Sequence, residues 1–251
     1  MDKAGSTFDS LLDGQLKLRQ PKTGHRAGTD AVLLAAAFGE VSGHLVDIGA
    51  GVGTIGLALA LRCPQARITL VELADEAAGL ARANVSLNGL EPRVSVAQAD
   101  ILDPRSRRAA GLIDGQADYA VSNPPFFEAG QVRVSGNAAR AAAHVFGKGD
   151  LARWIAACLA LVRPGGSFAL IHRPAALAEI LEGCAGRMGG LVLLPVHPRV
   201  DAPAIRLIVR GRKGSRAGPQ IVPGLVLHQA DGSFTARADA IHRGRALLDE
   251  I

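Results

Sequence analysis

A tetrapeptide in the middle of the chain, Asn123-Pro124-Pro125-Phe126, combines an amide, two rigid imino acids and an aromatic ring. It follows an apolar run at residues 117–123 that is typical of a strand, and prolines cannot continue a sheet ladder, so the strand must end here. Proline also biases Asn123 to an extended backbone and fixes its own φ, which makes the turn stiff. An amide oxygen and a backbone carbonyl are thereby held in set directions.

Such a pair of acceptors suits chemistry on a planar exocyclic amine, which is a poor nucleophile because its lone pair is delocalised. If the Asn123 side-chain oxygen and the Pro124 carbonyl each accept one N–H, the nitrogen can pyramidalise and direct its lone pair at a methyl sulfonium. Phe126 would stack on the base that carries the amine. The stiff turn would supply electrostatic preorganisation rather than acid–base catalysis. The same residues also suffice simply to end a strand, so their position in the fold decides between the two interpretations.

A glycine-rich stretch follows an earlier strand-like run and begins at Asp47. It contains Gly49, Gly51, Gly53 and Gly56. Glycines let a backbone approach a ligand where a Cβ would clash. Gly51, Gly53 and Gly56, together with Glu72 about 20 residues on, also match the dinucleotide fingerprint of nicotinamide enzymes. An acidic residue at Asp47 suits a cofactor with ammonium and sulfonium cations and would repel a pyrophosphate, which favours S-adenosylmethionine over NAD.

Three carboxylates lie at the ends of three successive predicted strands: Asp47, Glu72 and Asp100. We expect Glu72 to accept both ribose hydroxyls and Asp100 to accept from an adenine amine. Each could be an ordinary loop acid by itself, but all three together indicate a ligand site.

The elements that must position these residues alternate between strand and helix patterns. Strands are predicted at residues 44–50, 66–73, 93–100, 117–123 and 165–172, and helices at 51–62, 74–90, 150–162 and 174–186. This alternation predicts an α/β fold with a doubly wound parallel sheet and right-handed crossovers. Residues 189–198 and 203–213 are joined by so short a connection that they predict an antiparallel hairpin. Ligands of such sheets bind at the carboxyl ends of the strands, where the strand order reverses.

We divide the chain into three parts. Residues 1–40 form an N-terminal approach with a helix capped by Thr29, because a threonine hydroxyl can accept a first-turn N–H. Residues 41–215 form the core. Residues 216–251 add a strand and a helix, which we expect to pack on the core.

The overall composition indicates a folded, soluble protein, which we expect to be cytoplasmic. The start of the chain has no apolar segment of a secretory signal, and no apolar run is long enough to span a bilayer. Cys63, Cys158 and Cys184 lie far apart, which argues against disulfides and a zinc site and predicts buried thiols. A net charge of +5 at pH 7 is mild support for a polyanionic partner. The clearest basic run contains Arg199, Arg206, Arg210, Arg212, Lys213 and Arg216, and the N-terminal approach adds Arg19 and Lys22.

The chain resembles class I S-adenosylmethionine-dependent N-methyltransferases with an N-P-P-aromatic motif, most closely the bacterial tRNA adenine-N6 methyltransferases that modify the base beside the anticodon of valine tRNA. The resemblance rests on residues 28–34, 46–60, 71–73, 81–90, 98–101 and 122–127. It implies a Rossmann-like, mostly parallel seven-stranded sheet with an antiparallel C-terminal hairpin. The implied catalytic residues are Asn123, Pro124 and Phe126. The implied S-adenosylmethionine-binding residues are Asp47, Gly49, Gly51, Gly53, Glu72, Asp100, Asn123 and Thr29.

The substrate implied by this resemblance is RNA, most closely adenine N6 in tRNA. Phe126 stands where many relatives have tyrosine, and the basic tail after Arg199 has no counterpart that we can align, which leaves the substrate open. A protein glutamine or an rRNA guanine is an alternative acceptor, a nicotinamide oxidoreductase is a distant alternative, and a non-catalytic RNA-binding protein is another. Release-factor glutamine methyltransferases, by resemblance, carry a helical domain before the core, and DNA adenine enzymes carry a target-recognition domain. An RNA base already unstacked in a loop requires neither.

Three other residues have plain structural interpretations. Asn84 and Asn88 are expected to cap and turn the end of a helix. Trp154 lies at helical spacing from Leu151 and Cys158, which predicts a core position rather than a base-stacking platform.

Overall fold

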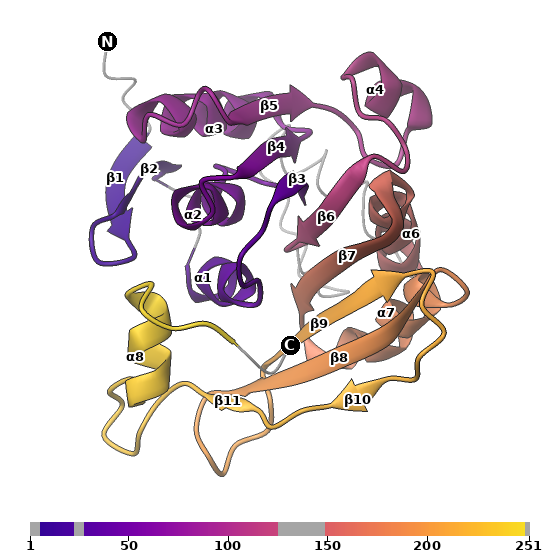
Figure 1. Ribbon diagram of the computed structural model, residues 1–251. Helices are drawn as coiled ribbons and strands as arrows, with labels where there is room; N and C mark the ends of the chain where they lie inside the picture. Colours follow the sequence, from indigo (N-terminus) through magenta and orange to yellow (C-terminus); the bar gives the residue numbers. More distant parts are fainter. Residues whose placement is uncertain (1–5, 23–27, 125–148, 249–251) are drawn as a thin grey trace.

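A twisted sheet runs through the centre of the molecule, with helices on both of its faces (Figure 1). The computed structural model describes residues 6–22, 28–124 and 149–248. The core strands are β3 (Gly43–Ile48), β4 (Ala66–Glu72), β5 (Val94–Gln98), β6 (Ala117–Ser122), β7 (Val162–His172), β8 (Met188–His197) and β9 (Arg206–Lys213). Their order is β8-β9-β7-β6-β3-β4-β5, and β9 runs antiparallel to both β7 and β8. The predicted mostly parallel sheet with an antiparallel hairpin is confirmed.

Two very short strands extend the sheet beyond β8. They are β10 (Gln220–Ile221) and β11 (Leu225–Val226), and both run parallel to β8. The sequence suggested one continuous strand over residues 221–228. Pro223 and Gly224 interrupt it, because proline has no N–H to donate and glycine weakens a strand interior. The described residues therefore form a nine-stranded sheet rather than a seven-stranded one.

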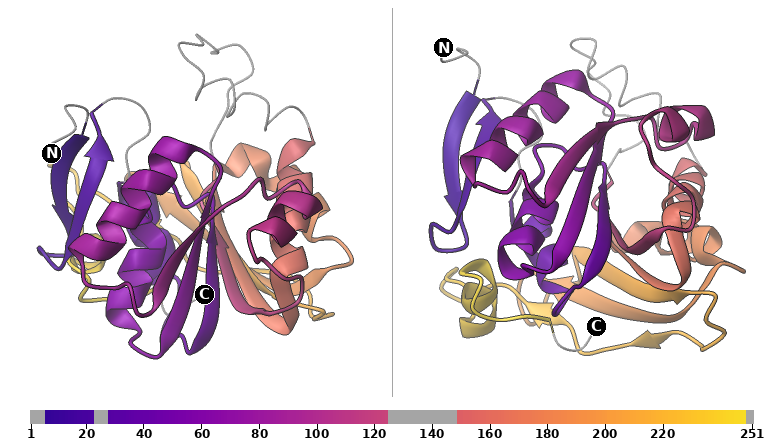
Figure 2. Two further views of the ribbon diagram at one scale, coloured as in Figure 1. Left: turned by 90° about the horizontal axis from the view of Figure 1, so that it is seen from above. Right: turned by 45° about the horizontal axis from the view of Figure 1, so that its top comes forward.

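The helices cover the two faces of the sheet in separate groups, which the views of Figure 2 show from above and from an oblique angle. They are α1 (Thr29–Ala36), α2 (Thr54–Arg62), α3 (Asp75–Leu87), α4 (Pro104–Ala109), α6 (Asp150–Leu161), η1 (Pro174–Ala176), α7 (Leu177–Cys184) and α8 (Ala236–His242). In α6 the buried residues include Leu151, Trp154 and Cys158, so the core position predicted for Trp154 is confirmed. All three cysteines are buried and free, as predicted. No described helix is long and apolar enough to cross a membrane.

The strand order reverses at β3, which lies between β4 and β6. Strands β3, β4, β5, β6 and β7 are mutually parallel along this path, so their carboxyl ends meet at one edge of the sheet. Ile48 pairs with Ser122 across β3 and β6, and with Val71 across β3 and β4. This edge is where a doubly wound sheet binds its ligand.

An N-terminal hairpin, which the sequence analysis did not predict, stands beside α3 at the outer edge of the molecule (Figure 1). Its strands are β1 (Ser6–Leu11) and β2 (Leu16–Pro21), which form a separate two-stranded sheet. Leu16, Leu18 and Gln20 alternate with more exposed residues and are buried against the core. A two-stranded hairpin is marginal in water, so it depends on such packing.

Asn84 in α3 and Asn88 at the C-cap of α3 form hydrogen bonds with backbone groups at the outer edge of β2. Asn84 accepts from the Arg19 N–H (2.6 Å) and donates to the Arg19 carbonyl (3.0 Å). Asn88 likewise accepts from the Lys17 N–H (3.0 Å) and donates to the Lys17 carbonyl (2.8 Å). A primary amide has the same donor and acceptor as a peptide group, so the pair replaces a third strand. Asn84 also donates to the carbonyl of Val52, at 3.0 Å. The predicted capping role fits Asn88, the C-cap of α3, but Asn84 lies inside the helix and holds other segments.

We expect Asn84→Ala to lower the free energy of unfolding by about 2–3 kcal/mol, because the fully buried amide leaves several backbone groups unpaired. Asn88→Ala is the matched control, since Lys17 is exposed and water can replace the lost amide. Urea denaturation of both variants checks this. Equal losses in the two variants would mean that burial does not set the strength of this anchor.

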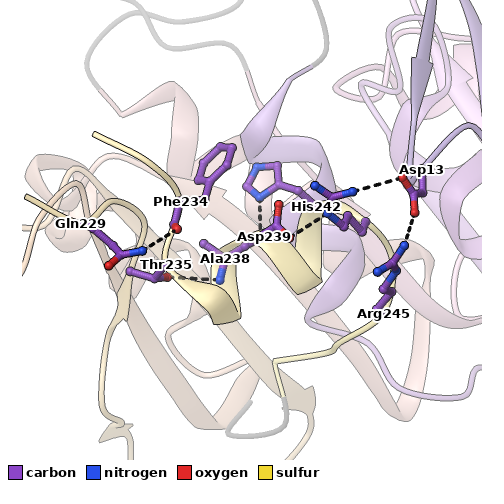
Figure 3. A network of polar contacts seen from close by, with 9 residues as sticks. Asp13, Gln229, Phe234, Thr235, Ala238, Asp239, His242 and Arg245 are labelled. Carbon is purple, nitrogen blue, oxygen red and sulfur yellow. Dashed lines mark hydrogen bonds and ion pairs between the residues drawn. The ribbon is translucent and has the colours of Figure 1, made fainter. Parts of the chain in front are cut away.

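The C-terminal segment packs its own small aromatic stack against α1. The His242 ring stacks on Phe234 at 4.3 Å between centroids, and Phe234 stacks on His228 at 4.8 Å. The Nδ1 atom of His242 donates to the Ala238 carbonyl (2.7 Å), as Figure 3 shows. Its Nε2 atom lies 3.2 Å from the Thr29 hydroxyl at the start of α1. The end of the chain thus reaches the beginning of α1.

Ion pairs add a second connection between the two ends of the chain. Asp13, in the turn of the hairpin, pairs with Arg243 and Arg245, which follow α8. Figure 3 shows the pair of Asp13 and Arg245. The Leu248 N–H donates to the Ala36 carbonyl at the end of α1 (2.9 Å). The hairpin, α1 and α8 therefore form one contiguous group on one side of the sheet.

Candidate functional site

The glycine-rich loop after β3 rests on the side chain of Asp47. Its carboxyl is fully enclosed, with 0% exposure, and Oδ2 accepts from the Gly56 N–H at 2.8 Å. That N–H belongs to the first turn of α2, whose backbone donors have no partner within the helix. Asp47 thus ties the end of β3 to the start of α2. Direct contact with a ligand, predicted from the sequence, is not open to an enclosed carboxyl in this conformation.

Burial raises the pKa of Asp47 to about 7. The Gly56 hydrogen bond opposes this rise, and the charge of Glu72 adds to it. The Oδ1 atom is buried and accepts no hydrogen bond within the described part of the chain. The loop is therefore built over a carboxyl that readily holds a proton near neutral pH.

Positive φ angles shape the loop at Gly49 (+70°), Gly51 (+55°) and Gly53 (+90°), which side chains rarely adopt. A Cβ at Gly53 would lie 2.8 Å from Leu70, so this glycine is needed for packing. A Cβ at Gly51 would meet nothing within 4 Å. Gly51 therefore presents bare backbone to open space, as a close approach of a ligand requires.

The carboxylate of Glu72 braces the loop from the end of β4. Its Oε2 accepts from the Gly51 N–H and its Oε1 from the Ala74 N–H, both at 2.8 Å. Asp100, just after β5, accepts from the Leu102 N–H through Oδ1 (2.8 Å). Both side chains are partly exposed at the same edge as Gly51. The structure thus brings together the strand-end acids Glu72 and Asp100.

Asn123 follows the end of β6 beside this loop. Its side-chain oxygen is buried and accepts no hydrogen bond from the described residues. A buried amide oxygen without a donor is costly, which makes it a candidate acceptor for a ligand N–H. Pro124 is buried next to it. Phe126 lies outside the described residues, so its role in stacking stays a prediction.

The strand end before Asn123 is fixed by a chain of hydrogen bonds. The Ser122 hydroxyl donates to the Ile48 carbonyl (2.8 Å) and accepts from Trp154 Nε1 (2.9 Å). A Cβ at Gly49 would lie 3.1 Å from the same indole ring. Trp154 thus supports both the Asn123 turn and the glycine loop, a role that its helical spacing alone did not indicate.

His172, which the sequence analysis missed, ends β7 at the same edge. Ser122 pairs with Leu170, so His172 lies beyond the end of β6, on the side of Asn123. Burial is the main cause that lowers the pKa of His172 to about 4; a backbone hydrogen bond with Arg173 opposes this shift, and the charges of Arg173 and Arg206 add to it. Its imidazole is neutral at physiological pH and carries no charge into the site.

Thr29 is not the N-cap predicted from the sequence. Gly28 holds that position, and its carbonyl accepts from the Ala31 and Val32 N–H groups. The helix begins one residue earlier than expected, and the Thr29 hydroxyl instead lies within hydrogen-bonding distance of His242 Nε2. The proposed contact of Thr29 with the cofactor stays a prediction.

The basic run at residues 199–216 does not form one surface, because much of it lies along β9, which runs from one end of the sheet to the other. The Arg210 guanidinium lies over the Phe38 ring at 4.7 Å and donates to a backbone carbonyl. Lys213 donates to two carbonyls at the end of α6 and the start of β7. Arg206 pairs with Asp30 at 2.7 Å. Only the Arg206 end of β9 lies at the edge of the site.

Comparison with known proteins identifies the family. Residues 26–157 match the methyltransferase small domain family. The tRNA1(Val) (adenine(37)-N6)-methyltransferase of Aeromonas hydrophila is 35% identical over 84% of this chain and 86% of that protein. This chain belongs to the methyltransferase small domain family. The result confirms the family and fold predicted from the sequence, and with them S-adenosylmethionine as the methyl donor. It removes the nicotinamide oxidoreductase alternative.

Two further matches show how far this methyltransferase resembles its relatives. A protein of Porphyromonas gingivalis with the same name as the Aeromonas relative is 41% identical, over 45% of this chain and 46% of that protein. The aligned part of this chain thus spans about half the length of that relative. A crystal structure from Agrobacterium tumefaciens, described as a predicted O-methyltransferase, has a TM-score of 0.73 and 32% identity, and covers 87% of this chain and 97% of that one.

In this methyltransferase we expect Glu72→Ala to raise the Kd of S-adenosylmethionine about tenfold or more. The variant removes the partner of the Gly51 N–H and the carboxylate that we expect to accept from the ribose hydroxyls. Calorimetric titration measures the effect, with Asp75→Ala, an exposed acid in the first turn of α3, as the control. Unchanged affinity in Glu72→Ala would remove Glu72 from the cofactor site.

Proposed function

We propose that this protein transfers a methyl group from S-adenosylmethionine to N6 of an adenine in tRNA. The observation that carries the proposal is the buried oxygen of Asn123 at the carboxyl edge of the sheet, beside the glycine loop, which accepts no hydrogen bond from the described residues. An exocyclic amine is the group whose N–H such an oxygen can accept. A hydroxyl acceptor has only one proton to donate, so a second fixed acceptor at Pro124 suits an amine better.

The residues at this edge fit the cofactor. Bare backbone at Gly51 permits close approach, and Glu72 and Asp100 offer carboxylate acceptors to the ribose and the adenine. When bound, S-adenosylmethionine supplies an electrophilic methyl carbon on a cationic sulfur. Glu72 also carries a negative charge that favours a cationic ligand.

In the proposed step, Asn123 and the Pro124 carbonyl each accept one N–H of the substrate amine and hold its lone pair toward the methyl carbon. A bond forms between nitrogen and carbon while the carbon–sulfur bond breaks, and the methylated amine then gives up one proton to solvent. The chain of hydrogen bonds through Ser122 and Trp154 keeps the turn from reorganising during this step.

The choice of tRNA as the acceptor is supported by the Aeromonas relative, which aligns over most of both chains. It is also supported by the chemistry of recognition. A base that is already unstacked in an RNA loop can enter a pocket without the cost of opening a base pair. The net charge of +5 favours a polyanionic substrate.

Methyl transfer with labelled S-adenosylmethionine to three separate acceptor pools tests the proposal. The pools are total tRNA lacking the modification, rRNA, and a bacterial release factor. We expect label in tRNA, as N6-methyladenosine after digestion to nucleosides. Label in a glutamine of the release factor or in a guanine of rRNA would overturn it.

A further inference from the structure

The N-terminal hairpin exposes a large aromatic side chain. Phe8 in β1 is 60% exposed, although burying a phenylalanine side chain would stabilise the folded protein. It lies on a strand whose partner, β2, buries its alternate residues against the core. A single exposed apolar side chain is common on protein surfaces, so the residues around Phe8 decide whether it belongs to a contact surface.

The register of the hairpin places basic side chains on the same face as Phe8. Phe8 pairs directly with Arg19, and Ser10 pairs with Lys17. Paired residues lie on one face of a sheet, with Cβ atoms about 5 Å apart, and the diagonal neighbours are within reach of long side chains. The outward face therefore combines an aromatic ring with the cations of Lys17 and Arg19.

The carboxylates of the described hairpin residues do not share this face. Asp9 pairs with Leu18 on the inner face and accepts from Gln20 Nε2 at 2.8 Å. Asp13 lies in the turn and pairs with Arg243 and Arg245. The exposed ammonium of Lys17 therefore gives the outward face a positive charge, which is complementary to a nucleic acid.

The hairpin is also anchored to the cofactor loop. Asn84 bonds Arg19 with its oxygen and nitrogen, and the same nitrogen donates to the carbonyl of Val52, between Gly51 and Gly53. One amide side chain thus joins β2 to the loop of the candidate site. Substrate held on the hairpin would be held in a fixed relation to that loop.

We propose, resting on the function proposed above, that this hairpin face binds the RNA substrate. Phe8 stacks on an unpaired base other than the methylated one, and Lys17 faces the adjoining phosphate. Stacking on an aromatic ring tolerates any base and strengthens binding to single-stranded segments. The hairpin would thereby supply RNA affinity that a catalytic pocket for one base lacks.

Affinity for an unmodified tRNA transcript tests the stacking. We expect Phe8→Ala to raise the Kd about tenfold or more, with the affinity for S-adenosylmethionine unchanged. Phe8→Leu should weaken binding as much as Phe8→Ala, since it keeps an apolar side chain but no ring face, and Phe8→Tyr should bind as the unaltered protein does. Ile221→Ala, at another side chain that is 73% exposed, is the matched control. Restoration by Phe8→Leu, or equal weakening by Ile221→Ala, would overturn the proposal.

Fluorescence offers a direct readout, because the chain has a single tryptophan and Trp154 is buried. Phe8→Trp should lose emission when tRNA is added, beyond any change in the unaltered protein, and Lys17→Gln should lower the slope of log affinity against log salt by about 0.7. If the unaltered protein neither binds nor methylates tRNA, the proposed function itself fails. If it does both and Phe8→Trp emission stays constant, the hairpin proposal alone fails.

Discussion

Asn123→Ala is expected to lower the rate of methyl transfer about 10²- to 10³-fold, with the Kd of S-adenosylmethionine changed by less than about twofold. The magnitude is that of removing one preorganised hydrogen-bonding group from a reaction centre. The loss should fall on kcat, because the amide orients the amine in the transition state and the glycine loop, Glu72 and Asp100 hold the cofactor. Single-turnover transfer and calorimetry measure the two quantities separately.

Asn123→Asp is the matched control, since it keeps a side-chain oxygen at the same place. We expect its rate to lie between those of the unaltered protein and Asn123→Ala. Parallel losses of rate and cofactor affinity in Asn123→Ala would show that Asn123 shapes the fold of the site and does not bind the amine.

Asp47 should make the stability of the cofactor-free protein depend on pH between about 4 and 7. Its folded pKa of about 7 lies above the ordinary value of 3.8, so the folded state holds the proton more tightly than the unfolded state does. This contribution to stability is complete below about pH 4 and is lost as the pH rises through 7. The loss would amount to at most about 4 kcal/mol, from 1.36 kcal/mol per pKa unit.

Asp47→Asn tests this expectation, because an amide keeps an oxygen for the Gly56 N–H but does not ionise. Urea denaturation of both proteins at pH 4, 5.5, 7 and 8 should show a fall in the free energy of unfolding that Asp47→Asn largely abolishes. An identical pH dependence in the two proteins would assign the fall to other carboxyl or imidazole groups. Asp47→Ala should additionally weaken S-adenosylmethionine binding, since it removes the support of the loop.

The core of the fold followed from local patterns. The strands and helices at residues 43–98 alternate within short stretches, and each carries its own hydrophobic periodicity, so parallel topology and the strand-end acids could be inferred together. The stiff turn at Asn123 could also be predicted from the sequence, because proline restricts the backbone of the residue before it.

Features that depend on distant contacts were not predicted. The hairpin is anchored by Asn84 and Asn88, more than 60 residues away in sequence, and no pattern within β1 or β2 reveals that partner. The sequence indicated surface charges at Arg210 and Lys213, because nothing near them in the chain reveals the Phe38 ring or the carbonyls of α6 and β7 with which they interact. His172 was missed because a histidine that ends a strand carries no motif.

A crystal structure of the protein with sinefungin and an RNA stem-loop containing the target adenine tests the central claim most directly. We predict that the exocyclic nitrogen lies within hydrogen-bonding distance of Asn123 Oδ1 and of the Pro124 carbonyl, and faces the amine that replaces the methyl group in sinefungin. An adenine bound elsewhere, with Asn123 Oδ1 accepting from the protein's own chain, would contradict the account.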